Sequence, residues 1–314
     1  MNSIDIAGHS LTAGKTKKDH IHVRGTEIHI PHVVLCGEQP GKTVVITAGI
    51  HNAEYIGIQA AIELSQELNP SEIKGNIVII PLVNRSGFEN RTMSLVYEDG
   101  KNLNRVFPGN EYGTEAEKLA KVVFDEFIAQ ADAYIDLHCG DGFETLTPYV
   151  YYVGEAPCAP VAKEMTQCVK TEYRVCSKCI SSGAYNEASM KGIPSVLIER
   201  GQLSLIKNEE VKEDKEDVIN ILKYLGVLEG EYNVYSKTDI LEYNDDAPMT
   251  GCWYPNMKVG DKFRKGDLFG EIRDYFGKTI YTAVANTDGI LIHQCSSLNI
   301  IKDGPMVTYG VAIE

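Results

Sequence analysis

The sequence of 314 residues has no long hydrophobic run, no cysteine framework and no excess of basic residues. A bilayer is spanned by about 20 consecutive apolar residues, and no segment reaches that length. The N-terminal stretch MNSIDIAGHSLTAGKTKK also lacks the apolar core and cleavage pattern of a secretion signal. We therefore expect a soluble, cytoplasmic protein.

Basic residues are outnumbered, 30 against 44 acidic residues, which gives a formal net charge of -14. This balance argues against nucleic acid or an anionic membrane as the main partner, although a local basic pocket stays open. The eight cysteines are scattered through a chain long enough to bury its own core, so we expect reduced thiols. The lone CxxC, Cys176 and Cys179, has no second pair at zinc-finger spacing and is interpreted as incidental.

The composition is that of an ordinary globular protein, with 43% hydrophobic and 24% charged residues. From residue 43 onward, short apolar runs alternate with amphipathic stretches, which predicts an α/β layer fold. The runs are apolar throughout, as in a mixed sheet with helices on both faces. The expected strands are 43–49, 75–84, 132–138 and 194–200, and the expected helices are 53–68, 113–130 and 218–228.

The pattern changes after residue 228. The acidic stretch 207–217 is interpreted as the solvated start of the last of these helices, which closes the first domain. From about residue 247, short strands recur with glycine turns and predict a small all-β domain. We thus expect a first domain at 1–228, a linker at 229–246 and a β domain at 247–314.

His51 and Glu54 follow the apolar run TVVITAG, where open α/β sheets place their ligands. At spacing i, i+3 at the start of a helix, both side chains can reach one metal ion, although an HxxE match also arises by chance. His138 ends another apolar run and completes two histidines and a carboxylate, the ligand set of a hydrolytic zinc site. Asp136 shares a strand face with His138 and either orients that ligand or is a buried structural acid.

Glu199 lies at the end of the apolar run PSVLIE, where a carboxylate is costly unless something uses it. It is either a general base beside a metal or the partner of a neighbour such as Arg200. The segment NRTMSLVYEDGKNLNRVFPG contributes Arg91, Asn104 and Arg105. Loop arginines are usually solvated, but beside a metal they bind a substrate carboxylate or a developing oxyanion.

The stretches GIHNAE, NLNRVFPG, IDLHCGD and IERG, in this order, resemble the succinylglutamate desuccinylase/aspartoacylase family, a branch of the zinc carboxypeptidase-like hydrolases. The resemblance covers nearly the whole chain and implies a zinc hydrolase catalytic domain at 1–228, followed by a small barrel-sandwich-like β domain. It also implies site residues: His51, Glu54 and His138 as ligands of one zinc ion per chain, Glu199 as general base, Arg91 as oxyanion partner, and Asn104 with Arg105 on the substrate α-carboxylate.

Some positions depart from the family pattern. Asn52 replaces the glycine that commonly follows the first histidine. Aspartoacylases carry an arginine ten residues before the catalytic glutamate, where this chain has Ser189, whereas Tyr185 matches a substrate-contacting tyrosine of those enzymes. The C-terminal segment is similar to a biotinyl/lipoyl hammerhead with Lys278 near the carrier turn. Its flanking residues match neither cofactor site, so we expect a lid or cleft wall there.

The sequence thus predicts a zinc-dependent amidohydrolase that cleaves a small N-acyl amino acid other than N-acetylaspartate. Its partner is a small-molecule substrate, with a homo-oligomer left open. A zinc carboxypeptidase acting on short peptides would use the same centre. A non-catalytic zinc-binding protein would keep the ligands and lose turnover.

Overall fold

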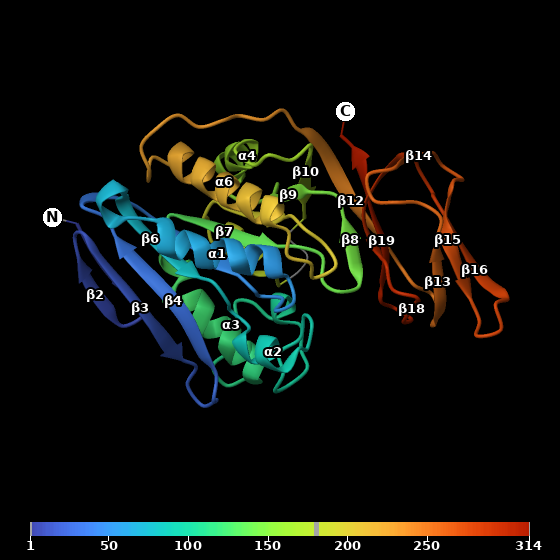
Figure 1. Ribbon diagram of the computed structural model, residues 1–314, viewed down its shortest axis with the longest axis horizontal. Coiled ribbons are helices and arrows are strands. Elements are labelled where there is room, and N and C mark those ends of the chain that lie inside the picture. The colour runs from blue at the N-terminus through green and yellow to red at the C-terminus, as the bar shows by residue number, and fades with distance from the viewer. Residues whose placement is uncertain (1, 179–181, 314) are drawn as a thin grey trace.

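The computed structural model describes residues 2–178 and 182–313. Within these residues, 13 strands form one mixed sheet and four C-terminal strands form a second sheet (Figure 1). The α-helices are α1 (Tyr55–Glu67), α2 (Arg85–Asn90), α3 (Glu115–Glu126), α4 (Ala159–Gln167), α5 (Ala184–Met190) and α6 (Asn208–Tyr224). Short 3-10 turns are η1 (Pro70–Glu72), η2 (Leu103–Arg105) and η3 (Ile128–Gln130). No helix of the described residues is long and apolar enough to span a bilayer.

The strands are numbered in chain order. The N-terminal strands are β1 (Ser3–Ile6), β2 (His9–Thr12), β3 (Lys15–His22), β4 (His29–Cys36), β5 (Gln39–Ala48) and β6 (Lys74–Ile80). The middle strands are β7 (Ala133–His138), β8 (Glu144–Leu146), β9 (Tyr149–Val153), β10 (Tyr173–Ser177) and β11 (Ser195–Glu199). The C-terminal strands are β12 (Thr238–Asp246), β13 (Gly251–Pro255), β14 (Lys262–Phe263), β15 (Leu268–Arg273), β16 (Thr279–Val284), β17 (Gly289–Cys295), β18 (Asn299–Ile300) and β19 (Pro305–Ala312).

The centre of the large sheet is parallel. Strand β5 pairs in parallel with β6 and β7, and β11 pairs in parallel with β7 on its other side. The register places Glu199 opposite His138, and Leu137 opposite Ala48. Because parallel strands end at the same edge, the residues at the carboxyl ends of β5, β7 and β11 come together there.

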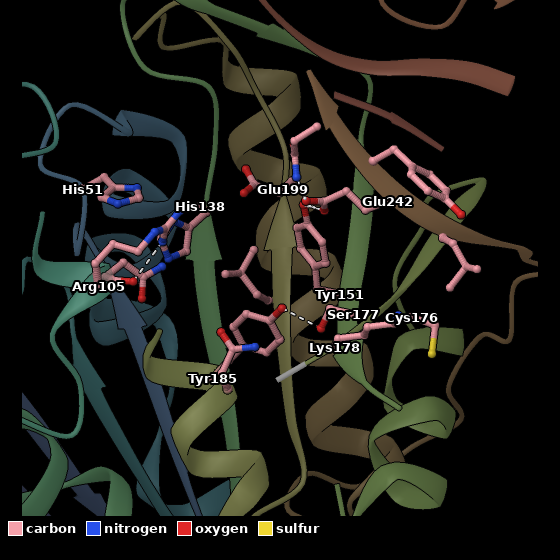
Figure 2. Close-up of a pocket in the computed structure, with 16 residues that line it drawn as sticks. His51, Arg105, His138, Tyr151, Cys176, Ser177, Lys178, Tyr185, Glu199 and Glu242 are labelled. Carbon is pink, nitrogen blue, oxygen red and sulfur yellow. Dashed lines mark hydrogen bonds between the residues drawn. The ribbon is translucent and has the colours of Figure 1, made fainter. Parts of the chain in front are cut away.

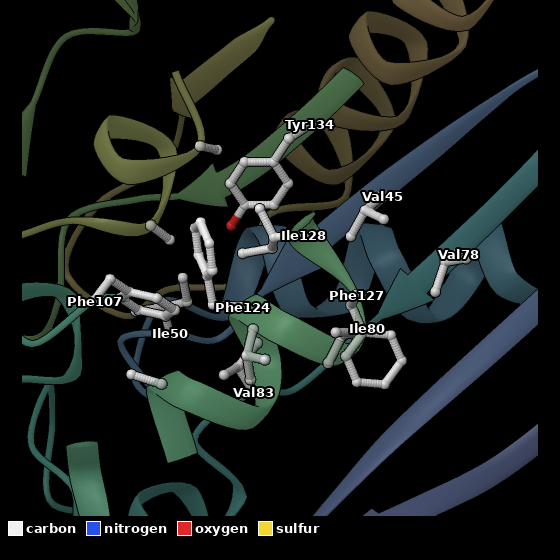
Figure 3. Packing of buried hydrophobic residues seen from close by; sticks show 14 of the residues in the cluster. Val45, Ile50, Val78, Ile80, Val83, Phe107, Phe124, Phe127, Ile128 and Tyr134 are labelled. Carbon is white, nitrogen blue, oxygen red and sulfur yellow. The ribbon is translucent and has the colours of Figure 1, made fainter. Parts of the chain in front are cut away.

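Helices cover both faces of this sheet. Along β5, Val44 and Ile46 pack into one core cluster with residues of α1 and α6, whereas Val45 packs into the other with residues of α3 and α5. Figure 3 shows the second cluster, in which Phe124 and Phe127 lie among strand residues. This alternation explains why the strands are apolar throughout, and it confirms the mixed α/β sheet predicted from the sequence.

Helix α6 differs from the expected solvated start over 207–217. It begins at Asn208, and Val211, Asp214 and Asp217 within the acidic stretch are buried. The physical reason is that α6 packs along α1, so one side of its first turns faces the protein interior. The stretch does begin a helix, as predicted, but the prediction that it is solvated is wrong for Asp214 and Asp217, which are buried.

The C-terminal part begins inside the expected linker. Strand β12 occupies 238–246, pairs in parallel with β10 and antiparallel with β19, and thereby joins both parts into one sheet. The four-stranded sheet of β13, β15, β16 and β18 packs on a core that includes Trp253 and Phe269. Lys278 lies in the exposed turn between β15 and β16.

Candidate active site

The first part of the site is the turn that follows β5. Gly49 has a φ of +67°, and a Cβ at this position would lie 2.8 Å from Leu82 Cδ1, so the turn requires glycine. His51 follows this turn, and Glu54 stands at the N-cap of α1. A carboxylate is favoured at a helix N-terminus because the backbone N–H groups there carry partial positive charge.

Glu54 lies between two histidines. Its Oε1 is 2.7 Å from His51 Nδ1, and its Oε2 is 2.8 Å from His138 Nδ1. His138 reaches this point from the end of β7, and the Cys139 N–H donates to Glu54 Oε2 at 3.2 Å. One ligand atom from each of His51, Glu54 and His138 can be chosen so that all lie within 4.8 Å of one another. The structure therefore brings together the three predicted metal ligands.

The second nitrogen of each imidazole also meets an oxygen. His51 Nε2 is 3.1 Å from Asn102 Oδ1, and His138 Nε2 is 3.1 Å from Asp136 Oδ2. Asp136 is in turn held by a 2.7 Å hydrogen bond from Thr47 Oγ1. Outer oxygen partners of this kind orient histidine ligands in metal sites, and here the Nδ1 atoms of both rings meet the Glu54 carboxylate.

The charges at this centre fit a divalent cation. Burial alone would raise the pKa of Glu54, but the neighbouring His138 and His51 outweigh it and lower that pKa to about 2. Burial alone would lower the pKa of His138, yet the Glu54 and Asp136 carboxylates raise it well above its ordinary value. Two imidazole nitrogens and an ionised carboxylate oxygen are a donor set suited to zinc.

Glu199 stands beside this centre at the end of β11. The described residues offer its carboxylate no hydrogen bond or ion pair. Glu199 lines two cavities, both of which are also lined by His51. Burial, reinforced by the Glu54 carboxylate, raises the pKa of Glu199 to about 8. Buried carboxyl groups with a raised pKa at the edge of a cavity are frequent among catalytic acids and bases.

Arg200 does not pair with Glu199. Adjacent residues of a strand point to opposite faces, and Arg200 instead bonds to Asp217 and, at 2.8 Å, to Glu213 of α6. Gly201, with a φ of +94°, follows, and a Cβ there would lie 2.5 Å from Ile56 Cγ1 of α1. The alternative of a Glu199–Arg200 salt bridge is thus wrong.

A cavity of about 520 Å³ opens beside His51, His138 and Glu199 (Figure 2). The predicted substrate-binding residues line it: Asn104, Arg105 and Tyr185. Asn104 Oδ1 accepts a 2.9 Å hydrogen bond from the Ala184 N–H at the start of α5, and Tyr185 Oη bonds to Ser177 Oγ at 2.9 Å. An adjoining cavity of about 740 Å³ shares His51, Arg105 and Glu199 with the first.

Two sequence-selected positions lie away from these cavities. Arg91 ends α2 in a left-handed conformation with a φ of 55°, is exposed and lines neither cavity. Ser189 is buried within α5 and also lines neither. Of the CxxC pair, Cys176 lines the 520 Å³ cavity, whereas Cys179 lies outside the described residues.

Sequence reasoning missed several cavity residues. Asn102 lies within the quoted motif NLNRVFPG, so its contact with His51 had a local signal. Tyr151 of β9, Glu242 of β12 and His293 of β17 had none, because sheet pairing brings them to the site from distant segments. His293 Nε2 is 3.5 Å from Glu144 Oε2, and that carboxylate helps raise the pKa of His293 to about 9 although burial opposes the shift.

Fold and site together define an α/β protein with a two-histidine, one-carboxylate centre and an adjacent glutamate at the carboxyl edge of its sheet. The sequence model of the succinylglutamate desuccinylase/aspartoacylase catalytic domain matches residues 40–225. The chain belongs to this family.

Known relatives agree with this assignment. The chain is 27% identical over 254 residues to the N-alpha-acetyl-L-2,4-diaminobutyric acid deacetylase of Halomonas elongata, covering 77% of this chain and 73% of that one. Among solved structures, it is similar to the product-bound ectoine utilization protein of Ruegeria pomeroyi, with a TM-score of 0.86, 22% identity and coverage of 99% and 98%. It is also similar to a succinylglutamate desuccinylase/aspartoacylase from Rhodobacter sphaeroides, with a TM-score of 0.84, 23% identity and coverage of 95% and 96%.

Proposed function

We propose that this protein is a zinc-dependent deacylase that hydrolyses the amide bond of small N-acyl amino acids. One observation carries the proposal: three parallel strand ends bring His51, His138 and Glu199 to one cavity, which Arg105 also lines. The family and the activity of the Halomonas elongata relative support the same reaction class.

The ligands His51, Glu54 and His138 would hold the zinc ion. Zinc held there would supply Lewis acidity and activate a water molecule toward the amide carbon. Glu199 is placed to accept a proton from that water and to deliver it to the departing amine nitrogen. The products are a carboxylic acid and the free amino acid, so no further reactant is needed.

Arg105 and Asn104 are the groups proposed to hold the substrate. The Arg105 guanidinium lines both cavities and can donate to a substrate α-carboxylate in the two-point geometry that arginine favours. Asn104 is buried, and its Oδ1 is already bound by the Ala184 N–H, which fixes its orientation. Because Arg91 lies outside the cavities, the proposed mechanism does not use it.

The C-terminal strands support a short substrate. Leu241, Tyr243 and Asn244 of β12 line the cavity beside the catalytic groups, and His293 of β17 lines the adjoining one. We propose that this wall belongs to the β domain and limits what can extend beyond the scissile bond. A small acyl group fits that boundary better than a peptide chain.

A substrate panel tests the proposal. The zinc-loaded protein is given N-acetyl amino acids, their α-carboxamides and peptides of two to four residues, with released amine as the readout. We expect the free acids to be hydrolysed fastest, because an amide cannot accept both arginine hydrogen bonds. Efficient trimming of tetrapeptides would favour a carboxypeptidase, and no release from any compound would contradict the proposal.

A matched pair of arginine variants sharpens this test. Arg105→Met should lower kcat/KM about 100-fold and abolish the preference for the free carboxylate, because a charged two-point contact is lost. Arg91→Met, which removes the same charge outside the cavities, should leave kcat/KM within about twofold of the original. Equal losses in both variants would restore the role that the sequence resemblance assigns to Arg91.

A further inference from the structure

Glu242 introduces a second acid into the catalytic cavity. It lies on β12, beyond residues 40–225 that match the family's catalytic domain, and reaches the cavity only because β12 pairs with β10. In Figure 2 its carboxylate meets the phenol of Tyr151, across the cavity lining from His51 and His138. Since Glu199 has the proton-transfer role, Glu242 is the one acid lining the 520 Å³ cavity that the mechanism leaves unused.

Neutral donors hold the Glu242 carboxylate in place. Tyr151 Oη donates to its Oε2, and Asn244 Nδ2 donates to its Oε1 at 2.8 Å. No lysine, arginine or histidine of the described residues lies within ion-pair distance of it. His293 has its direct ion pair with Glu144 at 3.5 Å, and the Glu242 charge contributes to the raised pKa of His293 from farther away. The Glu242 carboxylate is thus oriented by neutral donors and has no ion pair of its own among the described residues.

The lining of the cavity therefore carries opposite charges on different walls. Arg105 offers a guanidinium for a carboxylate, and Glu242 offers a carboxylate on a different wall. The position ten residues before Glu199, Ser189, carries no charge and is buried away from the cavity. A substrate with two carboxylates would bring its second negative charge into a cavity that already contains Glu242, and like charges in a partly buried site repel.

We infer that Glu242, oriented by Tyr151 and Asn244, is a specificity-determining residue that binds a cationic group on the substrate side chain. The inference rests on the proposed function where it says that the bound compound is hydrolysed. The binding of the cationic group by Glu242 does not depend on that function. The ligand class is a short diamino acid, N-acylated before turnover, whose carboxylate meets Arg105 and whose ammonium group meets Glu242.

Lys178 supports the opposite specificity, in which the cavity binds a substrate with an anionic side chain. It lines the same cavity, is exposed and has no ion pair among the described side chains, so an anionic side chain could be selected there instead. The two residues make opposite predictions for the same ligands. Glu242→Gln and Lys178→Gln are therefore a matched pair, each of which replaces one charge by an amide of similar size.

Product binding tests the inference without turnover. The dissociation constants of 2,4-diaminobutyrate, shape-matched neutral norvaline and aspartate are measured by titration calorimetry on the zinc-loaded protein. We expect diaminobutyrate to bind about 10- to 100-fold more tightly than norvaline, as for a hydrogen bond to a charged group. Glu242→Gln should reduce that ratio to within about threefold, and Lys178→Gln should leave it unchanged.

Several results would overturn the inference. For the unmodified protein, they are equal binding of diaminobutyrate and norvaline, or no binding of diaminobutyrate at millimolar concentration. For the variants, they are tighter binding of aspartate that Lys178→Gln abolishes, or equal weakening of all three ligands in Glu242→Gln. A failure of the proposed function is recognised separately. In that case the N-acetyl derivatives would not be hydrolysed, although the preference for diaminobutyrate and its dependence on Glu242 remained.

Discussion

Glu199 and Arg200 are neighbours at the end of β11, yet they belong to two different polar clusters. Glu199 faces the cavity beside His51, Glu54 and His138, and its carboxylate has no hydrogen-bonding partner among the described residues. Arg200 faces the interior under α6, where it is bound by Asp217, Glu213 and the Lys170 carbonyl oxygen. One cluster presents its polar atoms to a cavity, and the other satisfies most of them internally.

The difference shows how a buried charge can be explained. A charge without an internal partner is costly, so its retention at a cavity points to a ligand or a reaction. A charge with internal partners can be structural, although its removal leaves the partner buried and unpaired. Glu199 fits the first description and Arg200 the second. Substitutions in the two clusters should therefore affect different properties.

The largest effect is expected for Glu199→Gln. The amide cannot accept the proton from water, so kcat should fall about 100- to 10,000-fold, while the unfolding free energy and zinc content stay near those of the unmodified protein. Stopped assays of amine release measure kcat, denaturant unfolding measures the unfolding free energy, and metal analysis of the purified variant measures its zinc content. Near-normal kcat would remove Glu199 as the base, and a large loss of stability would place it in the structural cluster.

A loss of stability is expected instead for Asp217→Ala. Removing one partner from the buried Arg200–Asp217 pair should lower the unfolding free energy by about 3–5 kcal/mol. The control Glu213→Ala removes a more exposed partner of the same guanidinium and should cost about 1 kcal/mol or less. Equal losses in denaturant unfolding would show that the burial of the pair does not determine its importance.

Asp214 should make the structural cluster sensitive to pH. It is fully buried on α6, and burial raises its pKa to about 8 although the Arg200 charge opposes the shift. The folded protein therefore holds this proton more tightly than the unfolded chain does. The contribution of protonated Asp214 to stability is full below the unfolded pKa near 4 and is lost as pH rises toward about 8.

The comparison with Asp214→Asn isolates this contribution. The amide does not titrate, so the stability of the variant relative to the unmodified protein should increase steadily from about pH 5 to pH 8 and then level off. Unfolding in urea at each pH measures it, and Glu216→Gln, which changes an exposed carboxylate of the same helix, serves as the control. A constant difference between the two proteins over this range would mean that Asp214 titrates normally.

The parallel strands and the ligand set could be predicted from sequence because the signals are local. His51, His138 and Glu199 each follow or end an apolar run, and parallel strands that end together need no further information to bring them close. The order of the strands in the sheet could not be predicted in this way, because it depends on pairing between distant segments. Strand β12 lay in an expected linker, and its pairing with β10 and β19 brings Glu242 and Asn244 to the cavity. Exposed, weakly patterned strands of this kind carry little periodic signal.

Arg91 shows that a local sequence signal does not determine where a side chain points. Its position in an arginine- and asparagine-rich loop matched the expected role, but the left-handed turn at the end of α2 directs the chain so that Arg91 is exposed. The burial of Asp214 and Asp217 was not predicted for a related reason. An acidic run predicts a solvated helix, whichever side of that helix packs against the protein interior. Side-chain direction at turns and helix ends depends on tertiary packing, which the sequence pattern does not contain.

The most direct test of the account is a zinc titration of amine release. The purified protein is stripped of metal with a chelator, zinc is added back in steps, and hydrolysis of an N-acetyl amino acid is followed together with bound metal. The account predicts that activity is absent without metal and rises in proportion to zinc until about one ion is bound per chain, and that His138→Ala binds little zinc and stays inactive. Full activity in the metal-free protein, or a zinc-saturated protein that releases no amine from any N-acyl amino acid, would contradict it.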